Sequence, residues 1–278
     1  MTVSNKVRSV LFVPASRPER FSKALSCGAD VVVIDLEDAV APAEKAAARE
    51  ALKQYLEINI EAAVIVRINA ASTEHFTYDL ELCRQLPGVK AIMLAKAQSA
   101  EILQVAAETG KPIWPLVETA LGVTELPKMA RVKGVERFCL GALDLGVDIG
   151  IKPDTIGAQV VLDRVRCDLL LQSNVAGLAP PIETVFPSID NEVAIEQFAQ
   201  RASEMGFAGM LCIHPRQLSP VHQGFSPDEA EIDWARRVLV AAESAEAAFQ
   251  VDGKMVDAPV IRRACEILKQ ANDTTVIR

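Results

Sequence analysis

The chain has 278 residues, a length that α/β barrels reach as a single domain. Hydrophobic residues make up 50% of it and the formal net charge is -8, which excludes nucleic acid as a partner because phosphate binding needs a basic surface. No apolar run approaches the roughly 20 residues of a membrane span, and the N-terminal run at residues 10–13 is too short for a signal peptide. We therefore expect a cytoplasmic protein with no membrane partner.

The cysteines predict neither a zinc site nor a disulfide framework. They are scattered without a C-x-x-C pair and mostly sit in apolar stretches, where a free cysteine behaves as a small hydrophobic residue. The six positions are Cys27, Cys83, Cys139, Cys167, Cys212 and Cys265.

Short β-branched runs alternate with helical patterns from the start of the chain. Helical patterns at 18–26, 43–57 and 76–85 follow the first three runs. Eight runs are predicted strands, at 8–13, 31–34, 63–68, 91–94, 113–117, 138–140, weakly near Leu178, and 210–213. Apolar runs of this kind are typical of strands buried on both faces, and eight of them alternating with helices predict a (β/α)8 TIM barrel. An open doubly wound sheet is the alternative, although no G-x-G-x-x-G or G-x-x-x-x-G-K motif is present.

The C-terminal part of the chain lies outside this eightfold rhythm. Residues 227–248 predict one long amphipathic helix, residues 250–253 a turn, and the segment that starts at Lys254 a lid. We therefore expect a barrel catalytic domain at 1–225 and a C-terminal helix and lid segment at 226–278.

Polar side chains directly follow six of the eight predicted strands. The reactive groups of β/α barrels come from the C-terminal ends of strands, which makes these residues the candidates for the site. They are Asp35, Glu37, Asp38, Arg67, Asn69, Lys96, Glu118, Asp144 and His214. Helix caps and acids that compensate the helix dipole explain many such residues, Asp38 above all. Arg67 and Glu118 follow apolar runs directly and are expected to point into the barrel mouth, where an unpaired charge would be costly.

The types of polar residue favour a hard divalent cation. Several carboxylates, only three histidines and no thiolate cluster indicate magnesium or manganese rather than zinc, and we predict Mg2+. A site with two carboxylates leaves coordination positions for a 2-oxo or 2-hydroxy acid.

The segment RSVLFVPASRPERFSKALSCGADVVVIDLEDAV, followed by VRINA, resembles the citrate lyase beta subunit family, which belongs with the malyl-CoA lyases in the HpcH/HpaI aldolase superfamily. Similar segments follow in the same order over nearly the whole chain: PLVETALG, GALDLGVDIG, GFAGMLCIHPRQ, FSPDEAEIDWARRVL and DGKMVDAPVIRRA. The resemblance implies an acyl-CoA thioester substrate. It also implies a β/α barrel that forms a homotrimer, in which the C-terminal segment of one subunit reaches over its neighbour's active site.

The resemblance further implies roles for residues in the barrel mouth. Glu118 and Asp144 match the magnesium ligands of the family, with Glu118 also at the substrate. Glu37 and Asp38 match acids that hold metal-bound water. Arg67 matches the arginine that polarises the substrate.

Other matched residues lie outside this group. Asp257 matches an acid that completes the neighbouring active site and transfers protons, although a helix N-cap is its simpler interpretation. The remaining matches are to the region that receives coenzyme A and its thioester arm: Arg17, Arg20, Lys23, Ile213 and His214.

The sequence departs from the family pattern at four positions. Leu121 stands where the family usually has arginine, Leu143 where it has glutamate, and Ala15 and Ser16 where it has glycine followed by aspartate or asparagine. Loss of the arginine argues against citryl substrates, which carry an extra carboxylate. The predicted function is a magnesium-dependent carbon–carbon lyase that cleaves (3S)-citramalyl-CoA to acetyl-CoA and pyruvate.

Three alternatives remain open at this point. The chain could be a citrate lyase beta subunit, which converts a citryl group on an acyl carrier protein to oxaloacetate and an acetyl group. It could be a malyl-CoA lyase. The two leucines also leave open a non-catalytic scaffold barrel.

Overall fold

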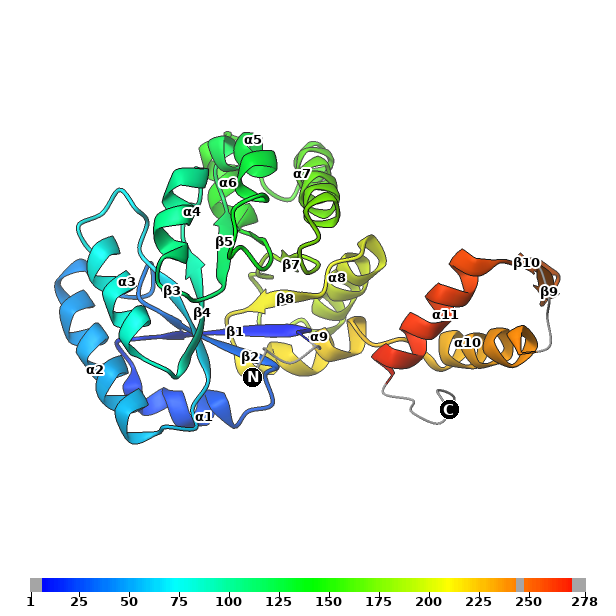
Figure 1. Cartoon of the computed structure of the whole chain (residues 1–278), viewed down its shortest axis with the longest axis horizontal. Helices are drawn as coiled ribbons and strands as arrows, with labels where there is room; N and C mark the ends of the chain where they lie inside the picture. The colour runs from blue at the N-terminus through cyan, green and yellow to red at the C-terminus, as the bar shows by residue number, and fades with distance from the viewer. Residues whose placement is uncertain (1–6, 244–247, 272–278) are drawn as a thin grey trace.

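A computed structural model describes residues 7–243 and 248–271, and its eight parallel strands close into a barrel in chain order (Figure 1). The predicted TIM barrel is confirmed, and the open doubly wound sheet is wrong. The strands are β1 (Ser9–Pro14), β2 (Val31–Asp35), β3 (Val64–Ile68), β4 (Val89–Leu94), β5 (Ile113–Val117), β6 (Cys139–Leu140), β7 (Ile182–Glu183) and β8 (Gly209–Cys212).

Alternate residues of each strand face the barrel interior and the surrounding helices, which divides the core in two. On β3, Ile65 belongs to the interior cluster, with Met93, Trp114 and Leu211 from other strands. Its neighbours Val64 and Val66 belong to the larger cluster between the strands and the helices. Both faces of the strands are therefore buried, which explains the continuous apolar runs in the sequence.

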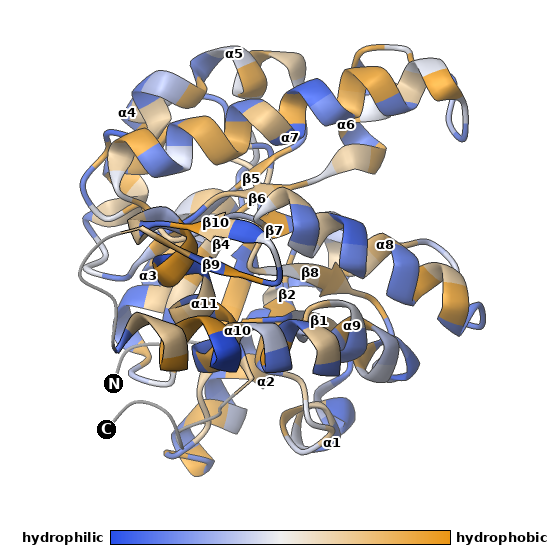
Figure 2. Ribbon diagram, turned by 90° about the vertical axis from the view of Figure 1, so that its right-hand side faces the viewer, coloured by the Kyte–Doolittle hydropathy of each residue, from blue (hydrophilic) through white to orange (hydrophobic). Residues whose placement is uncertain are grey.

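Helices surround the barrel, and many of them carry alternating hydrophobic and hydrophilic segments, as Figure 2 shows for α5, α7 and α8. Side chains of Ser99, Thr119, Thr155 and Asn191 cap four helix N-termini. None of the described helices is long and apolar enough to cross a membrane. The helical elements of the barrel are η1 (Pro18–Arg20), α1 (Phe21–Leu25), η2 (Pro42–Glu44), α2 (Lys45–Ile58), α3 (Phe76–Gln85), α4 (Ala100–Ala107), α5 (Ala120–Met129), α6 (Ala142–Asp148), α7 (Ile156–Ala176), α8 (Glu192–Met205), η3 (Pro215–Gln217) and α9 (Leu218–Gly224).

The seventh strand begins four residues later than predicted. Gly177 ends α7 in the left-handed conformation with φ 68°, and the backbone N–H of Leu178 donates to the carbonyl of Ser173. Leu178 therefore completes the helix C-terminus and cannot join the sheet. The strand forms after Pro181, where the N–H of Ile182 donates to the carbonyl of Phe138.

The C-terminal arm consists of α10 (Glu229–Ala242), β9 (Phe249–Val251), β10 (Lys254–Val256) and α11 (Ala258–Gln270). The predicted single helix at 227–248 is too long, since α10 ends at Ala242, and residues 244–247 lie outside the described residues. The predicted turn at 250–253 is also too long. Only Asp252 and Gly253 turn, with φ 54° and 75°, as in the Asp-Gly turns that join two hairpin strands.

The arm has a hydrophobic core of its own and extends away from the barrel (Figure 1). Ala235 and Val238 of α10 pack with Val256 of the hairpin and with Ala264 and Leu268 of α11. The arm therefore does not depend on the barrel core for its packing.

Candidate active site

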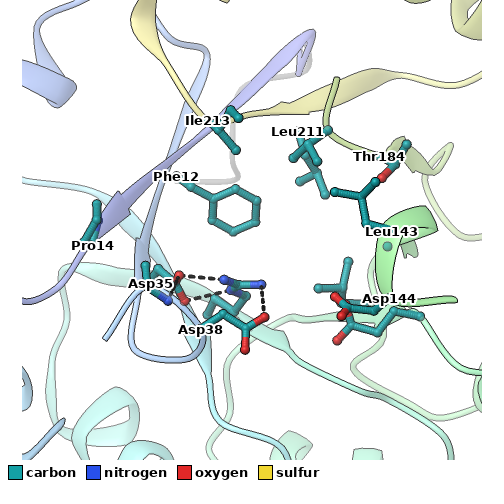
Figure 3. Close-up of a pocket in the computed structure, with 15 residues that line it drawn as sticks. Phe12, Pro14, Asp35, Asp38, Leu143, Asp144, Thr184, Leu211 and Ile213 are labelled. Atoms are coloured by element: carbon teal, nitrogen blue, oxygen red, sulfur yellow. Dashed lines mark hydrogen bonds and ion pairs between the residues drawn. The ribbon is translucent and has the colours of Figure 1, made fainter. Parts of the chain in front are cut away.

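A cavity of about 400 Å³ opens at the C-terminal ends of the strands (Figure 3). Among the described residues, none from the arm lines it. The lining residues are Phe12, Pro14, Asp35, Asp38, Ala39, Arg67, Leu116, Glu118, Gly141, Leu143, Asp144, Thr184, Val185, Leu211 and Ile213.

Arg67 is held at one side of the cavity by Asp35 of the neighbouring strand. These residues pair in the register of β2 and β3, and the guanidinium Nε and Nη2 donate to the two carboxylate oxygens at 2.7 and 2.6 Å. Asp35 is 1% exposed and also accepts from the backbone N–H groups of Glu37 and Ala39. The ring of Phe12 lies against the guanidinium, and the ring centroid is 4.7 Å from Cζ of Arg67. Burial would lower the pKa of Arg67, but Asp35 outweighs it and raises the pKa, so the arginine stays charged.

Glu37 and Asp38 lie beside this pair, in the loop after β2. Glu37 Oε2 is 3.2 Å from Nη1 of Arg67, and its Oε1 accepts from Nζ of Lys96 at 2.5 Å. Asp38 lies farther away, 4.0 Å from Arg67 and 3.8 Å from Lys96. Burial of Glu37 raises its pKa despite the two cations. The two acids of this loop therefore form a charged network with Arg67 and Lys96, and this network fixes Arg67 from one side.

Glu118 directly follows β5 and points into the cavity from a tightly packed position. It is 2% exposed, and its Oε1 accepts from the backbone N–H of Lys96 at 2.7 Å. A Cβ added to Gly141 would lie 2.6 Å from both Cβ and Oε2 of Glu118. Glycine at position 141 is therefore what leaves room for this carboxylate.

Asp144 shares this end of the cavity, in the first turn of α6, where the helix dipole favours an acid. Burial raises the pKa of Glu118 to about 8, and the negative charges of Glu37 and Asp144 add to the shift. The groups of the protein alone therefore stabilise the negative charge of ionised Glu118 only poorly. The described residues hold no group of three or more His, Cys, Asp or Glu side chains suited to a metal. Two carboxylates nevertheless fit magnesium, which keeps several waters and accepts one or two protein ligands.

The structure places the other predicted residues farther from this centre. Ile213 lines the cavity, but His214 caps η3 and accepts from the backbone N–H of Arg216 at 3.2 Å. Asp257 caps α11 in the arm, accepting from the N–H of Val260 at 3.3 Å, and does not line the cavity. Three exposed cations follow β1 and do not line the cavity: Arg17 at the N-cap of η1, Arg20 on η1 and Lys23 on α1.

Two residues at strand ends were candidates but were not given a role in the predicted site. Asp35 holds Arg67, and Lys96 contacts Glu37 through its side chain and Glu118 through its backbone. Their position after apolar runs was the available signal. The sequence does not show which acid of the segment DLED would pair with the arginine.

The model of the family described as HpcH/HpaI aldolase/citrate lyase matches residues 8–215. The chain belongs to this family. The resemblance seen in the sequence and the expectation of a lyase of the aldolase superfamily are thereby confirmed.

Relatives in this family are similar over almost their whole length. A citrate lyase subunit beta-like protein of Mycobacterium tuberculosis (strain ATCC 25618 / H37Rv) is 37% identical over 270 residues, which cover 95% of this chain and 96% of that protein. A (3S)-malyl-CoA thioesterase of Cereibacter sphaeroides (strain KD131 / KCTC 12085) is 33% identical, covering 98% and 96%.

Solved structures of relatives share the fold. CitE from Mycobacterium tuberculosis in complex with magnesium, acetoacetate and coenzyme A superposes with a TM-score of 0.85 at 35% identity, covering 96% of this chain and 99% of that one. CitE in complex with magnesium and pyruvate has a TM-score of 0.77 at 31% identity, covering 96% and 100%. The magnesium that the sequence predicts is thus present in these related structures.

Proposed function

We propose that the protein is a magnesium-dependent carbon–carbon lyase acting on a hydroxyacyl-CoA thioester, with (3S)-citramalyl-CoA cleaved to acetyl-CoA and pyruvate. The observation that carries the proposal is the juxtaposition of the Glu118 and Asp144 carboxylates with the Arg67 guanidinium in one cavity. Related structures that bind magnesium with pyruvate, or with acetoacetate and coenzyme A, support it.

Glu118 and Asp144 are the residues that would hold the metal. Magnesium bound there supplies Lewis-acid chemistry, lowering the pKa of a substrate hydroxyl and orienting the neighbouring carboxylate. Glu37 and Asp38 lie within the same charged network and are proposed to hold water at the metal.

Cleavage begins when the substrate hydroxyl loses its proton. The bond between the hydroxyl-bearing carbon and the carbon next to the thioester then breaks, forming the carbonyl of pyruvate and moving the bonding electrons into a thioester enolate. Arg67 stabilises the negative charge that develops on the enolate oxygen, because its guanidinium is fixed by Asp35 before the reaction. Protonation of the enolate carbon gives acetyl-CoA.

The acids that line the cavity hold Arg67, the metal or metal-bound water in this proposal, so the two proton transfers are assigned to a group from outside it. We propose that Asp257 from a neighbouring copy takes the hydroxyl proton and returns it to the enolate carbon, within a homotrimer. The extension of the arm away from its own barrel supports an action in trans (Figure 1). Arg17, Arg20 and Lys23 are proposed to bind coenzyme A phosphates, with Ile213 and His214 along the thioester arm.

The cavity is less polar than a citryl substrate requires. Leu143 lines the cavity and is about half exposed, as is Leu121. At both positions the family usually carries a charged side chain. The methyl group of citramalyl-CoA suits such a wall better than a second carboxymethyl arm.

All six cysteines are free, which supports the proposed cytoplasmic location.

The test is an assay of purified protein with citramalyl-CoA, malyl-CoA and citryl thioesters on coenzyme A or an acyl carrier protein. We expect EDTA-sensitive release of pyruvate and acetyl-CoA from citramalyl-CoA. Release of free coenzyme A without pyruvate would indicate a thioesterase instead, and cleavage of the carrier-bound citryl group alone would indicate a citrate lyase beta subunit. Absence of both turnover and magnesium binding would favour the scaffold alternative.

A further inference from the structure

A second cavity, of about 390 Å³, lies beside the catalytic cavity between α6, α7, α8 and the segment after β7. Three residues line both cavities: Leu143, Thr184 and Val185. The two spaces therefore meet at these side chains. The lining that belongs to the second cavity alone is mainly apolar and includes Val147, Ile151, Leu162, Phe186, Pro187 and Phe198.

The charged groups of this second cavity do not favour an anionic ligand. Arg166 gives Nε and Nη2 to Glu183 at 2.7 and 3.1 Å and Nη1 to Asp163 at 3.0 Å, so its charge is already neutralised. The hydroxyl of Thr155 donates to a backbone carbonyl and caps α7. Asp154 adds an exposed negative charge to the lining. An apolar group is thus the ligand that this surface accommodates at least cost.

The junction of the two cavities lies next to the proposed metal ligands. Leu143 immediately precedes Asp144 and is 54% exposed, and both lie with Thr184 on the side of the catalytic cavity opposite Pro14 (Figure 3). A hydroxy acid held through its carboxylate and hydroxyl near Glu118 and Asp144 carries its remaining substituent on the same carbon. Because Leu143 adjoins Asp144, a substituent directed to this side of the catalytic cavity meets Leu143 and the second cavity.

We propose that the second cavity receives an aliphatic branch of the substrate, so that besides citramalyl-CoA the enzyme acts on thioesters whose 2-oxo acid product has a side chain longer than the methyl group of pyruvate. The inference rests on the proposed lyase function and extends its substrate class to thioesters that release larger alkyl-substituted 2-oxo acids, such as 4-methyl-2-oxopentanoate. Each buried methylene strengthens binding about fourfold. The additional carbons of 4-methyl-2-oxopentanoate therefore give an affinity on the order of 50-fold above that of pyruvate.

The test measures two properties of the full chain in saturating Mg2+. Calorimetry gives the Kd of pyruvate, 2-oxopentanoate, 4-methyl-2-oxopentanoate and oxaloacetate, and the condensation of each acid with acetyl-CoA gives kcat/KM. Leu162→Trp fills the second cavity, and Val160→Trp is the matched control, because Val160 is an exposed residue of the same helix that does not line it. Ala158→Val serves as a second, smaller filling variant if the tryptophan prevents folding.

We expect affinity to rise along the alkyl series and oxaloacetate to bind more weakly than 2-oxopentanoate. Leu162→Trp or Ala158→Val should lower the affinity for 4-methyl-2-oxopentanoate at least tenfold and leave pyruvate unchanged, while Val160→Trp matches the unmodified protein. Turnover of pyruvate with flat or falling affinity along the series would overturn the inference and leave the lyase intact. Binding of the longer acids without any condensation would overturn the proposed function and keep the pocket. No binding of any acid would overturn both.

Discussion

Replacing Gly141 by alanine perturbs the proposed metal site without replacing a ligand. The added Cβ would lie 2.6 Å from Cβ and Oε2 of Glu118. The side chain of Glu118, with its carboxylate, must therefore move by roughly 1 Å to restore ordinary van der Waals separations. The backbone itself tolerates alanine, because Gly141 has φ -108°. Overpacking of this kind costs about 1–3 kcal/mol of stability.

The larger expected effect of Gly141→Ala is on the metal. Changes that reorient a ligand commonly weaken metal binding about 10–100-fold, and we expect a loss in that range for Mg2+. Calorimetry and the dependence of turnover on magnesium concentration measure it. Gly146→Ala is the matched control in α6, the helix that Gly141 precedes, since its Cβ would meet Ile151 at an ordinary 3.5 Å. Magnesium affinity of Gly141→Ala within about twofold of the unmodified protein would refute the assignment of Glu118.

Three further predictions concern individual charged groups. Arg67→Lys should lower turnover about 100-fold or more with magnesium binding retained, because an ammonium cannot span both oxygens of Asp35. A lower melting temperature with unchanged turnover would instead show that the role of the arginine is purely structural. The pKa of Glu118 is about 8 in the folded protein, against an ordinary value of 4.5 that applies to the unfolded chain. Between these pH values the folded protein keeps a proton that the unfolded chain loses. The stability of the metal-free protein should therefore fall as pH rises from about 4.5 to 8. Melting curves should show this fall, and Glu118→Gln should remove it; an equal fall in that variant would assign it to another group. Inactive Asp257→Ala chains mixed with inactive Glu118→Gln chains should regain partial activity, whereas no recovery despite demonstrated subunit exchange would contradict an action in trans.

The barrel could be predicted because each strand is buried on both faces and so appears in the sequence as an apolar run. Strand β5 shows this well, since the run IWPLV corresponds to the observed bounds Ile113–Val117. The rule fails for β7, which has only two residues and follows a helix end that takes up Leu178. In the arm, the hairpin was missed although Asp252 and Gly253 carried the signal, because the flanking strands are only three residues long.

The candidate site was less predictable, because it depends on register between strands distant in sequence. Three acids stand within the segment DLED, and only the alignment of Asp35 with Arg67 across β2 and β3 determines which of them holds the arginine. Once Asp35 occupies two guanidinium donors, Glu37 is left to the remaining nitrogen and to Lys96, and Asp38 stays at the rim. The acids of one loop thus acquire different environments from a single pairing.

The same reasoning explains why the proposal for the substrate rests on the structure rather than on the motif. The proposed ligands Glu118 and Asp144 identify the kind of chemistry, but nothing in their spacing shows that Leu143 borders two cavities. In the sequence Leu143 is only a departure from a family pattern, equally consistent with a lost activity. In the fold it borders both the charged cavity and an apolar one in which Arg166 is already neutralised. The leucine matches the apolar lining of the second cavity, and this match supports the proposed change of substrate over a lost function.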